Sequence, residues 1–260
     1  MPEGDTVHLA ATRLHAALGG ETLTRTDLRV PRHATADLSG RVLHEVVARG
    51  KHLLFRIEGG MTLHTHFKMD GSWRLLRHGE RWPAPGFQAR AMLETASWVA
   101  VGFLLGAVDL VATSAEHRLV GHLGPDLLGA DWDPEEAVRR LRLDRDRPIG
   151  EALLDQRALA GIGNVYKCEI CFLRGIDPFA PVGSVGDLDV TVALAKRLLE
   201  ANRATGRQVT TGDLRRGRGR WVYGRVGRAC RRCATTILGT AGDGSATGRV
   251  THWCPACQPQ

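Results

Sequence analysis

Two pairs of cysteines near the C-terminal end constrain the fold of this chain more than any other feature. Each pair has two residues between its cysteines, and 20 residues separate the pairs, which are Cys230 with Cys233 and Cys254 with Cys257. Two such pairs can grip one tetrahedral zinc ion, and their spacing is typical of four-cysteine modules. Disulfides are the poorer alternative because the sequence has no secretion signal. We expect one structural Zn²⁺, no organic cofactor, and a zinc-finger module at residues 221–260.

A third cysteine pair, Cys168 and Cys171, has the same spacing but a different context. It lies in Asn164–Phe172, a segment that we expect to be helical. No second pair is nearby to complete a metal site. We therefore interpret these two cysteines as packing residues on one face of a helix.

The positive charge of the chain is concentrated at its C-terminal end. The 260 residues carry a formal net charge of +7, and residues 207–260 alone hold ten arginines, no lysine and two acidic residues. A basic module attached to a nearly neutral body favours a polyanionic partner, with nucleic acid first. The alternative, a solvated basic tail, does not explain Trp221, Tyr223 and the paired cysteines.

The distribution of apolar residues excludes a membrane protein. The most apolar stretch, Trp98–Leu110, is shorter than the roughly 18 residues of a membrane-spanning helix and contains Asp109. The N-terminus lacks the basic and apolar pattern of a signal peptide. We expect a soluble cytoplasmic protein without membrane contacts.

Residues 21–113 show the pattern of short strands with frequent turns. Gly59 and Gly60 mark one turn, and prolines mark a loop at residues 77–86. This pattern predicts a β-sandwich or a β-barrel. The expected strands are residues 41–49, 51–57, 61–67, 71–76, 88–93 and 97–103.

Helical patterns dominate the second half of the chain. Expected helices cover residues 134–141, 148–157, 164–173 and 188–204, and a stretch that alternates Arg with Gly follows at residues 215–220. We predict an α+β multidomain chain. It comprises an N-terminal β-sandwich domain with a helix at its start (residues 1–130), a helical domain (131–220) and the zinc finger (221–260).

The chain begins Met1-Pro2-Glu3, ahead of a predicted helix that Thr6 can cap. If Met1 is removed, Pro2 presents a secondary amine that can attack an electrophilic carbon and form an iminium. The positive end of the helix would disfavour protonation of that amine. Alternatively, Pro2 merely permits removal of Met1 and starts the helix.

Two further motifs have both a structural and a functional interpretation. Glycines in Gly161–Asn164 expose backbone N–H groups ahead of a helix, which suits a DNA phosphate but also an ordinary interhelical turn. Lys51, which follows Arg49 and Gly50 at the start of a strand, can serve a function or protect a sheet edge from aggregation.

Taken together, motifs along nearly the whole chain resemble the formamidopyrimidine-DNA glycosylase/endonuclease VIII family. They occur in the order found in that family. The Pro2-Glu3-Gly4 start looks most like the second endonuclease VIII type of actinobacteria. The motifs are Pro2–Thr6, Arg49–His52, Leu159–Asn164, Tyr223–Arg225, the four cysteines, and Gly248–Cys257.

The resemblance implies roles for five residues. Pro2 would attack C1′ of the damaged nucleoside, and Glu3 would protonate the sugar ring oxygen and assist later proton transfers. Lys51 would contact a phosphate and donate a proton. Arg249 would grip the phosphates that flank the lesion. Asn164 would bind phosphate from the helix–two-turn–helix element.

The segment Leu63–Gly71 matches the family segment that fills the hole left by a flipped nucleotide. Met69 is the candidate wedge, although ordinary sheet packing is the alternative, and Lys68 is a candidate for phosphate or base contact. Arg225 is also a candidate DNA-binding residue. Two positions depart from the family pattern: Asp70 replaces a hydroxyl or aromatic residue, and His122 replaces a basic one. His64 and His66 lack a third metal ligand, so we interpret them as structural or DNA-facing.

The sequence therefore predicts a bifunctional DNA glycosylase and abasic-site lyase of base excision repair. It would remove oxidised bases, with a preference for pyrimidines, through a Pro2 iminium followed by β- and δ-elimination. The alternative is a non-catalytic zinc-containing DNA-binding protein of the same fold. In either case we expect a monomer that binds damaged DNA in the bacterial nucleoid.

Overall fold

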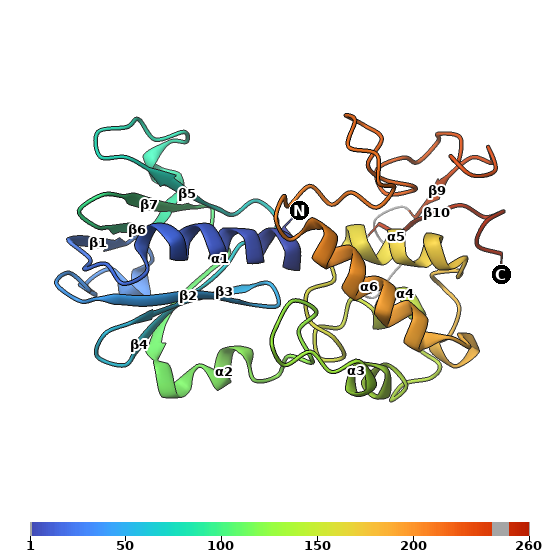
Figure 1. The fold of residues 1–260 in the computed structure, drawn as a ribbon, viewed down its shortest axis with the longest axis horizontal. Helices are drawn as coiled ribbons and strands as arrows, with labels where there is room; N and C mark the ends of the chain where they lie inside the picture. The colour runs from blue at the N-terminus through green and yellow to red at the C-terminus, as the bar shows by residue number, and fades with distance from the viewer. Residues whose placement is uncertain (1, 241–249, 260) are drawn as a thin grey trace. The chain divides into compact units, whose positions relative to one another are not determined.

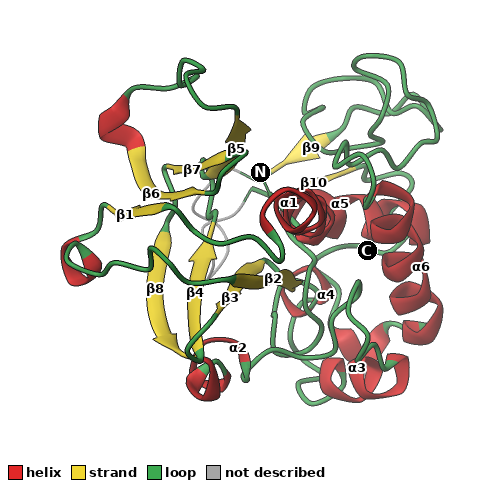
Figure 2. Cartoon of the chain, turned by 60° about the vertical axis from the view of Figure 1, so that its left-hand side comes forward, coloured by secondary structure: helices red, strands yellow, loops and turns green. Residues whose placement is uncertain are grey.

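The computed structural model describes residues 2–240 and 250–259 and separates into two compact units. Pro2 and residues Thr6–His122 belong to the first unit, whereas Glu3–Asp5 and the chain from Leu123 onward belong to the second. The three-domain division at residues 130 and 220 stays a prediction. Figures 1 and 2 show the elements of both units.

The first unit is a β-sandwich of two four-stranded antiparallel sheets. One sheet has the order β1-β6-β7-β5 and the other β2-β3-β4-β8. The strands are β1 (Arg25–Leu28), β2 (Leu43–Arg49), β3 (His52–Ile57), β4 (Met61–His66), β5 (Ser72–Leu76), β6 (Ala89–Glu94), β7 (Val99–Phe103) and β8 (Ala107–Ala112). Its helices are α1 (Gly4–Leu18), which starts in the second unit, and α2 (His117–Val120), with 3-10 turns at Pro31–His33, Gly86–Gln88 and Thr113–Ala115.

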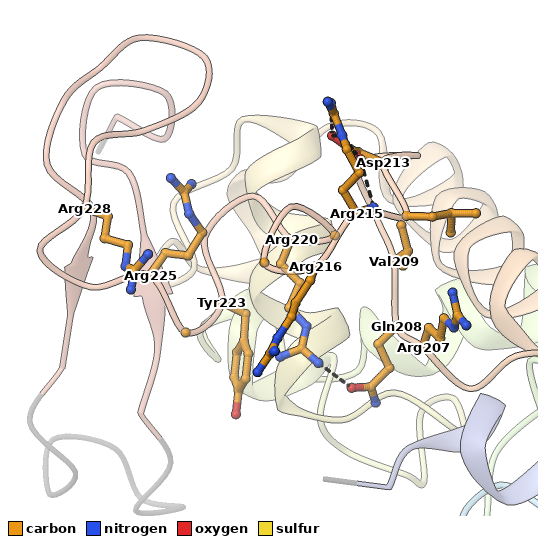
Figure 3. Close-up of a pocket in the computed structure, with 14 residues that line it drawn as sticks. Arg207, Gln208, Val209, Asp213, Arg215, Arg216, Arg220, Tyr223, Arg225 and Arg228 are labelled. Atoms are coloured by element: carbon orange, nitrogen blue, oxygen red, sulfur yellow. Dashed lines mark hydrogen bonds and ion pairs between the residues drawn. The ribbon is translucent and has the colours of Figure 1, made fainter.

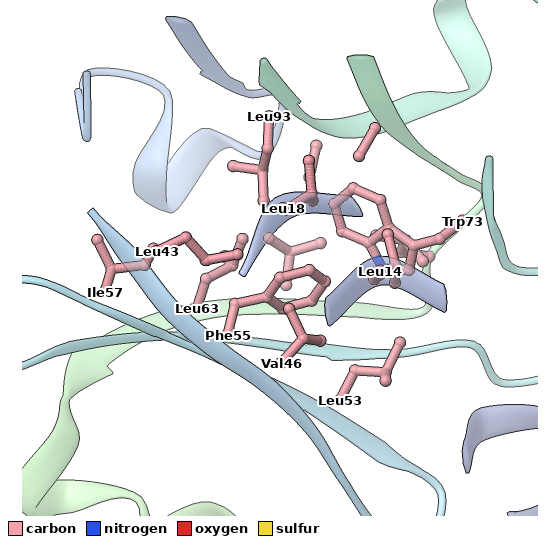
Figure 4. Close-up of a cluster of buried hydrophobic side chains, with 14 of the residues drawn as sticks. Leu14, Leu18, Leu43, Val46, Leu53, Phe55, Ile57, Leu63, Trp73 and Leu93 are labelled. Atoms are coloured by element: carbon pink, nitrogen blue, oxygen red, sulfur yellow. The ribbon is translucent and has the colours of Figure 1, made fainter. Parts of the chain in front are cut away.

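Apolar side chains of both sheets and of α1 form the core of this unit (Figure 4). Phe55 and Leu63 are fully buried because alternate residues of β3 and β4 face the core. Leu14 and Leu18 of α1 are buried against them. The helix begins at Gly4, so the prediction that Thr6 caps it is wrong: Thr6 lies inside its first turns.

The second unit is built around four helices, α3 (Pro134–Leu141), α4 (Ile149–Ala152), α5 (Asn164–Arg174) and α6 (Leu188–Asn202). Asp133 caps α3 because its side chain accepts the backbone N–H of Glu136. The predicted helix at residues 148–157 is wrong in length. The Asp155 side chain accepts the backbone N–H of Arg157 at 2.9 Å, and this local turn replaces a further helical turn.

A 3-10 turn covers Val182–Ser184, between α5 and α6. Among the described residues after α6, the regular elements are the short strands β9 (Leu238–Gly239) and β10 (His252–Trp253), which pair antiparallel. A small apolar cluster joins Phe172 of α5 to Val222 and Ile237. Among the described helices, none combines the length and the apolar character needed to cross a membrane.

Candidate active site

The carboxylate of Glu3 binds the N-terminus of α5 within the second unit. Its oxygens accept the backbone N–H groups of Gly163 and Val165, each at 2.7 Å, and that of Tyr166 at 3.3 Å. Glu3 is fully buried. Three donors and the helix dipole together stabilise a buried negative charge at this position.

The glycine turn before α5 is shaped by this carboxylate. Gly163 has no room for a side chain, because a Cβ there would lie 2.5 Å from Cδ of Glu3. Gly161 has a φ of +116°, and its carbonyl accepts the N–H of Gly4 at 2.9 Å. The hypothesis that these backbone donors serve a DNA phosphate is therefore wrong for Gly163, whose N–H binds Glu3.

Helix α5 also binds the segment directly before β10. Asn164 donates from Nδ2 to the carbonyl of Val250 at 2.7 Å, and Lys167 donates from Nζ to Oγ1 of Thr251 at 2.7 Å. Both polar side chains are buried. Oδ1 of Asn164 has no hydrogen-bond partner among the described residues. Arg249, the predicted phosphate-gripping residue, lies outside the described residues.

A second buried acid on α5, Glu169, organises the segment after residue 220. It accepts the backbone N–H groups of Trp221, Val222 and Tyr223 at 2.8–2.9 Å and the hydroxyl of Thr210. Three consecutive N–H groups pointing at one carboxylate fix the course of this segment.

Sequence reasoning missed this set of polar residues on α5. Tyr166 also donates its hydroxyl to Asp5 at 2.9 Å, and burial together with Asp5 raises the pKa of Tyr166. The available signal was the presence of Lys167 and Glu169 in an otherwise apolar helix, since buried charges require partners.

Pro2 borders a cavity of about 590 Å³ in the first unit. Charged walls come from Arg13 of α1 and from Asp70 and Arg74, and Trp73 adds an aromatic wall. The cavity thus brings the predicted nucleophile and the unexpected acid Asp70 to one place.

The turn between β4 and β5 carries the predicted wedge. Met69 is 60% exposed, which is unusual for a large apolar side chain and contradicts ordinary sheet packing. Lys68 has a φ of +56°, a strained value for a residue with a side chain. The turn is closed by a 3.0 Å hydrogen bond from Gly71 N to Phe67 O.

Lys51 lies directly before β3, beside a group of histidines in the first unit. Burial is the main cause that lowers the pKa of His66 to about 4, and the positive charges of Lys68 and Lys51 contribute to the same shift. His122 also belongs to this group, with its ring centroid 6.4 Å from that of His52.

Residues 207–228 form a second cavity, of about 600 Å³, in the second unit (Figure 3). Six arginines line it, and Asp213 is paired with one of them, Arg215. Arg220 packs over the ring of Tyr223 at 5.2 Å. The guanidinium of Arg225 donates to the carbonyls of Trp221 and Ala229, so it also has a structural role. The arginines lining the cavity are Arg207, Arg215, Arg216, Arg220, Arg225 and Arg228.

The four predicted metal ligands come together in the second unit. The sulfur atoms of Cys230, Cys233, Cys254 and Cys257 all lie within 4.8 Å of one another. Three of their separations are 3.4, 3.5 and 3.9 Å. A tetrahedral ion with metal–sulfur bonds of about 2.3 Å needs separations of roughly 3.8 Å, so the cluster fits one ion.

Cys168 and Cys171 are both buried in α5, as the packing interpretation predicts. Burial raises the pKa of the Cys168 thiol to about 11 and that of Cys171 to about 12. Thiols with such values stay protonated at neutral pH and are poor nucleophiles.

Comparison with known proteins identifies two domains of one enzyme family. The formamidopyrimidine-DNA glycosylase N-terminal domain matches residues 1–104, and the H2TH domain of the same family matches residues 123–209. The chain is 56% identical to "Probable endonuclease 8 2" of Streptomyces coelicolor, covering 99% of this chain and 94% of that protein. It is 50% identical to "DNA-(apurinic or apyrimidinic site) lyase Nei2" of Mycolicibacterium smegmatis, covering 99% of both.

Solved structures show the same fold. A complex of Lactococcus lactis Fpg with DNA that contains an oxidised pyrimidine superposes with a TM-score of 0.81, covering all of both chains at 23% identity. Another complex of Lactococcus lactis Fpg, with abasic DNA, also has a TM-score of 0.81.

Proposed function

This chain belongs to the formamidopyrimidine-DNA glycosylase family, as its motifs predict, and we propose that Pro2 is the nucleophile through which it acts as a DNA glycosylase and abasic-site lyase in base excision repair. The observation that carries this proposal is the position of Pro2 at the edge of a charged cavity. The preferred substrates are oxidised pyrimidines in DNA. The relatives' names and the Arg-rich C-terminal part of the chain support DNA as the partner.

The proposed reaction begins with the Pro2 amine, once Met1 has been removed. A bond forms between the nitrogen and C1′ while the bond from C1′ to the base breaks. The base leaves with the bonding electron pair and takes a proton from solvent, and the nitrogen loses its proton to Glu3. Opening of the C1′–O4′ bond, with a proton delivered to O4′, leaves an iminium. The positive iminium acidifies C2′, so loss of a C2′ proton expels the 3′ phosphate, and a second elimination expels the 5′ phosphate.

Glu3 is the proposed proton shuttle for these steps. Its backbone donors favour the ionised carboxylate, which can first accept the proton released by Pro2 and then return it to O4′. Hydrogen bonds to α5 also hold Glu3 in one place.

The remaining site residues have binding roles in this proposal. Lys51, Asn164 and Arg249 contact the phosphates around the lesion, and Lys68 and Arg225 contact DNA nearby. Met69 occupies the space left by the flipped nucleotide, which offsets the cost of unstacking. Exposure of this apolar side chain supports the wedge role.

We also propose that the cysteine cluster binds one Zn²⁺. Four thiolates with tetrahedral spacing fit this ion, which stabilises the C-terminal module and supplies no chemistry to the reaction. The protein is proposed to be a cytoplasmic, nucleoid-associated monomer with three functional parts at residues 1–130, 131–220 and 221–260.

Borohydride trapping on abasic DNA tests the nucleophile. Protein whose intact mass shows loss of Met1 should form a covalent adduct that peptide mapping places on Pro2. A variant that retains an added residue before Pro2 should lose most of the adduct, and Pro2→Gly should trap more slowly. Equal trapping by all three proteins would show that another amine is the nucleophile.

A further inference from the structure

The sheet formed by β2, β3, β4 and β8 has a polar face opposite the core. His52 is directly paired with His66, and His64 is directly paired with Asp109, so all four side chains emerge on the same side of the sheet. The alternate residues, including Phe55 and Leu63, face the core. His64 is only 4% exposed, so its ring nitrogens need hydrogen-bond partners.

A continuous hydrogen-bond chain links three of these side chains. Nδ1 of His64 lies 3.1 Å from Oδ2 of Asp109, and Nε2 of His64 lies 2.8 Å from Nδ1 of His52. The carboxylate of Asp109 can only accept, so Nδ1 of His64 carries the proton. Nε2 of an uncharged His64 then accepts, which requires the proton of His52 to be on Nδ1.

The imidazoles of His52 and His64 in this hydrogen-bond chain are both uncharged at neutral pH. Burial is the main cause and lowers the pKa of His52 to about 3, with further lowering by the other histidines and Lys68. Burial also lowers the pKa of His64, although Asp109 acts in the opposite direction. Nη1 of Arg32 lies 3.8 Å from Oδ1, the other oxygen of Asp109.

This hydrogen-bond chain leads to the two lysines that border the proposed DNA site. The ring of His52 packs edge-on against that of His66, with centroids 4.7 Å apart and an interplanar angle of 76°. Nδ1 of His66 accepts the backbone N–H of Lys68 at 2.8 Å, which fixes the proton of uncharged His66 on Nε2. Lys51 and Lys68 are the two cations that act on His66.

We propose that Asp109 and His64 are positioning residues: they fix the tautomer and ring orientation of His52, which in turn holds the ring of His66 in place beside Lys51 and Lys68. This inference rests on the proposed function, in which the two lysines contact DNA. An uncharged His66 adds no positive charge beside Lys51 and Lys68, whereas a protonated ring would repel both ammonium groups.

Asp109→Asn is the sharpest test because an amide has the same shape but can donate. Arg32, next to the other oxygen of Asp109, binds the amide oxygen of the variant, so the amide nitrogen faces Nδ1 of His64 and donates to it. Both hydrogen bonds of the chain then reverse, and the proton of His52 moves to Nε2. Nitrogen NMR of the imidazoles should show protons on Nδ1 of His52 and His64 in the wild type, and on Nε2 of both rings in the variant.

The kinetic effect should be on binding rather than on chemistry. For cleavage of abasic DNA, Asp109→Asn should raise KM about tenfold while kcat changes less than about threefold, as expected for a residue that supports a binding group. Asp27→Asn, on β1, is the matched control and should leave tautomers and KM unchanged. Asp109→Glu should partly restore the wild-type tautomers.

The possible failures are distinguishable. Unchanged tautomers in folded Asp109→Asn, or a reversed chain with unchanged KM, would overturn the positioning role. An absence of trapping and cleavage by the wild type would instead contradict the proposed function, while the NMR comparison would still report on the hydrogen-bond chain.

Discussion

The Glu3 carboxylate and the backbone N–H of Gly163 are joined by a 2.7 Å hydrogen bond between residues 160 positions apart. This bond requires glycine at position 163, because any Cβ there would overlap the carboxyl group. The glycine turn that resembles a phosphate site is therefore occupied by an acid of the same chain.

We expect Gly163→Ala to displace Glu3. The backbone of Gly163 is extended, with φ −123° and ψ −162°, so alanine adds no backbone strain and the effect is purely steric. Overpacking of this kind costs about 1–3 kcal/mol of unfolding free energy. Trapping on abasic DNA should fall at least about tenfold, because proton transfer contributes factors of 10²–10⁴. Gly186→Ala, where a Cβ meets open space, is the matched control. Normal stability and normal trapping in Gly163→Ala would refute the steric argument.

Met69→Ala should weaken function without affecting stability. The side chain is 60% exposed, so the free energy of unfolding should change by less than about 0.5 kcal/mol. Affinity for a lesion-containing duplex should fall, whereas affinity for undamaged DNA should not. Leu143→Ala, at a position 72% exposed in the second unit, should change neither affinity. If fluorescence anisotropy finds both Met69→Ala affinities unchanged, the wedge assignment is wrong.

Glu169→Gln should destabilise the second unit. One carboxylate oxygen of Glu169 accepts the N–H of Trp221, and the other accepts those of Val222 and Tyr223. Glutamine replaces one of these oxygens with an NH₂ group, which then faces N–H groups that also donate. Loss of hydrogen bonds to a buried charge costs about 1.5–3 kcal/mol. Urea unfolding should detect this loss, and Glu135→Gln, at an exposed site, should show none. Equal urea midpoints for Glu169→Gln and Glu135→Gln would show that Glu169 does not fix the course of the segment after residue 220.

Zinc removal should abolish DNA cleavage, and only the four cysteines of the C-terminal cluster should be needed to bind zinc. Cys233→Ser removes a thiolate from the cluster and should lower the metal content measured by elemental analysis. Cys171→Ala should retain one zinc ion per chain, because this buried thiol is part of the helical core. Cleavage by verified zinc-free protein, or zinc loss in Cys171→Ala, would each contradict these assignments.

Local patterns explain which elements the sequence predicts well. Pro134–Leu141 is a helix with the expected bounds, and six strands lie within one or two residues of their expected positions. The sequence does not single out strand β1, because its residues, Arg25–Leu28, are mostly polar and show no alternation. The helix predicted at residues 148–157 is shorter in the structure because the local turn at Asp155 competes with its last turns.

Partnerships between distant residues could not be predicted in this way. The cysteine cluster was predicted because its spacing carries geometric information. The partner of Glu3 is 160 positions away, and His64 and Asp109 are brought together only by the pairing of β4 with β8. Such pairs depend on the register of the complete fold, which neither composition nor periodicity contains.

The assignment of Glu3–Asp5 to the second unit has a genetic consequence. A recombination between relatives at residue 122 would join the helices of one parent to the first residues of another, although Glu3 and Asp5 complete the polar contacts of α5. The first codons must therefore be inherited together with the distant codons for Gly163 and Tyr166. The two halves of this gene therefore cannot be exchanged independently between relatives, even though each codes for most of one compact unit.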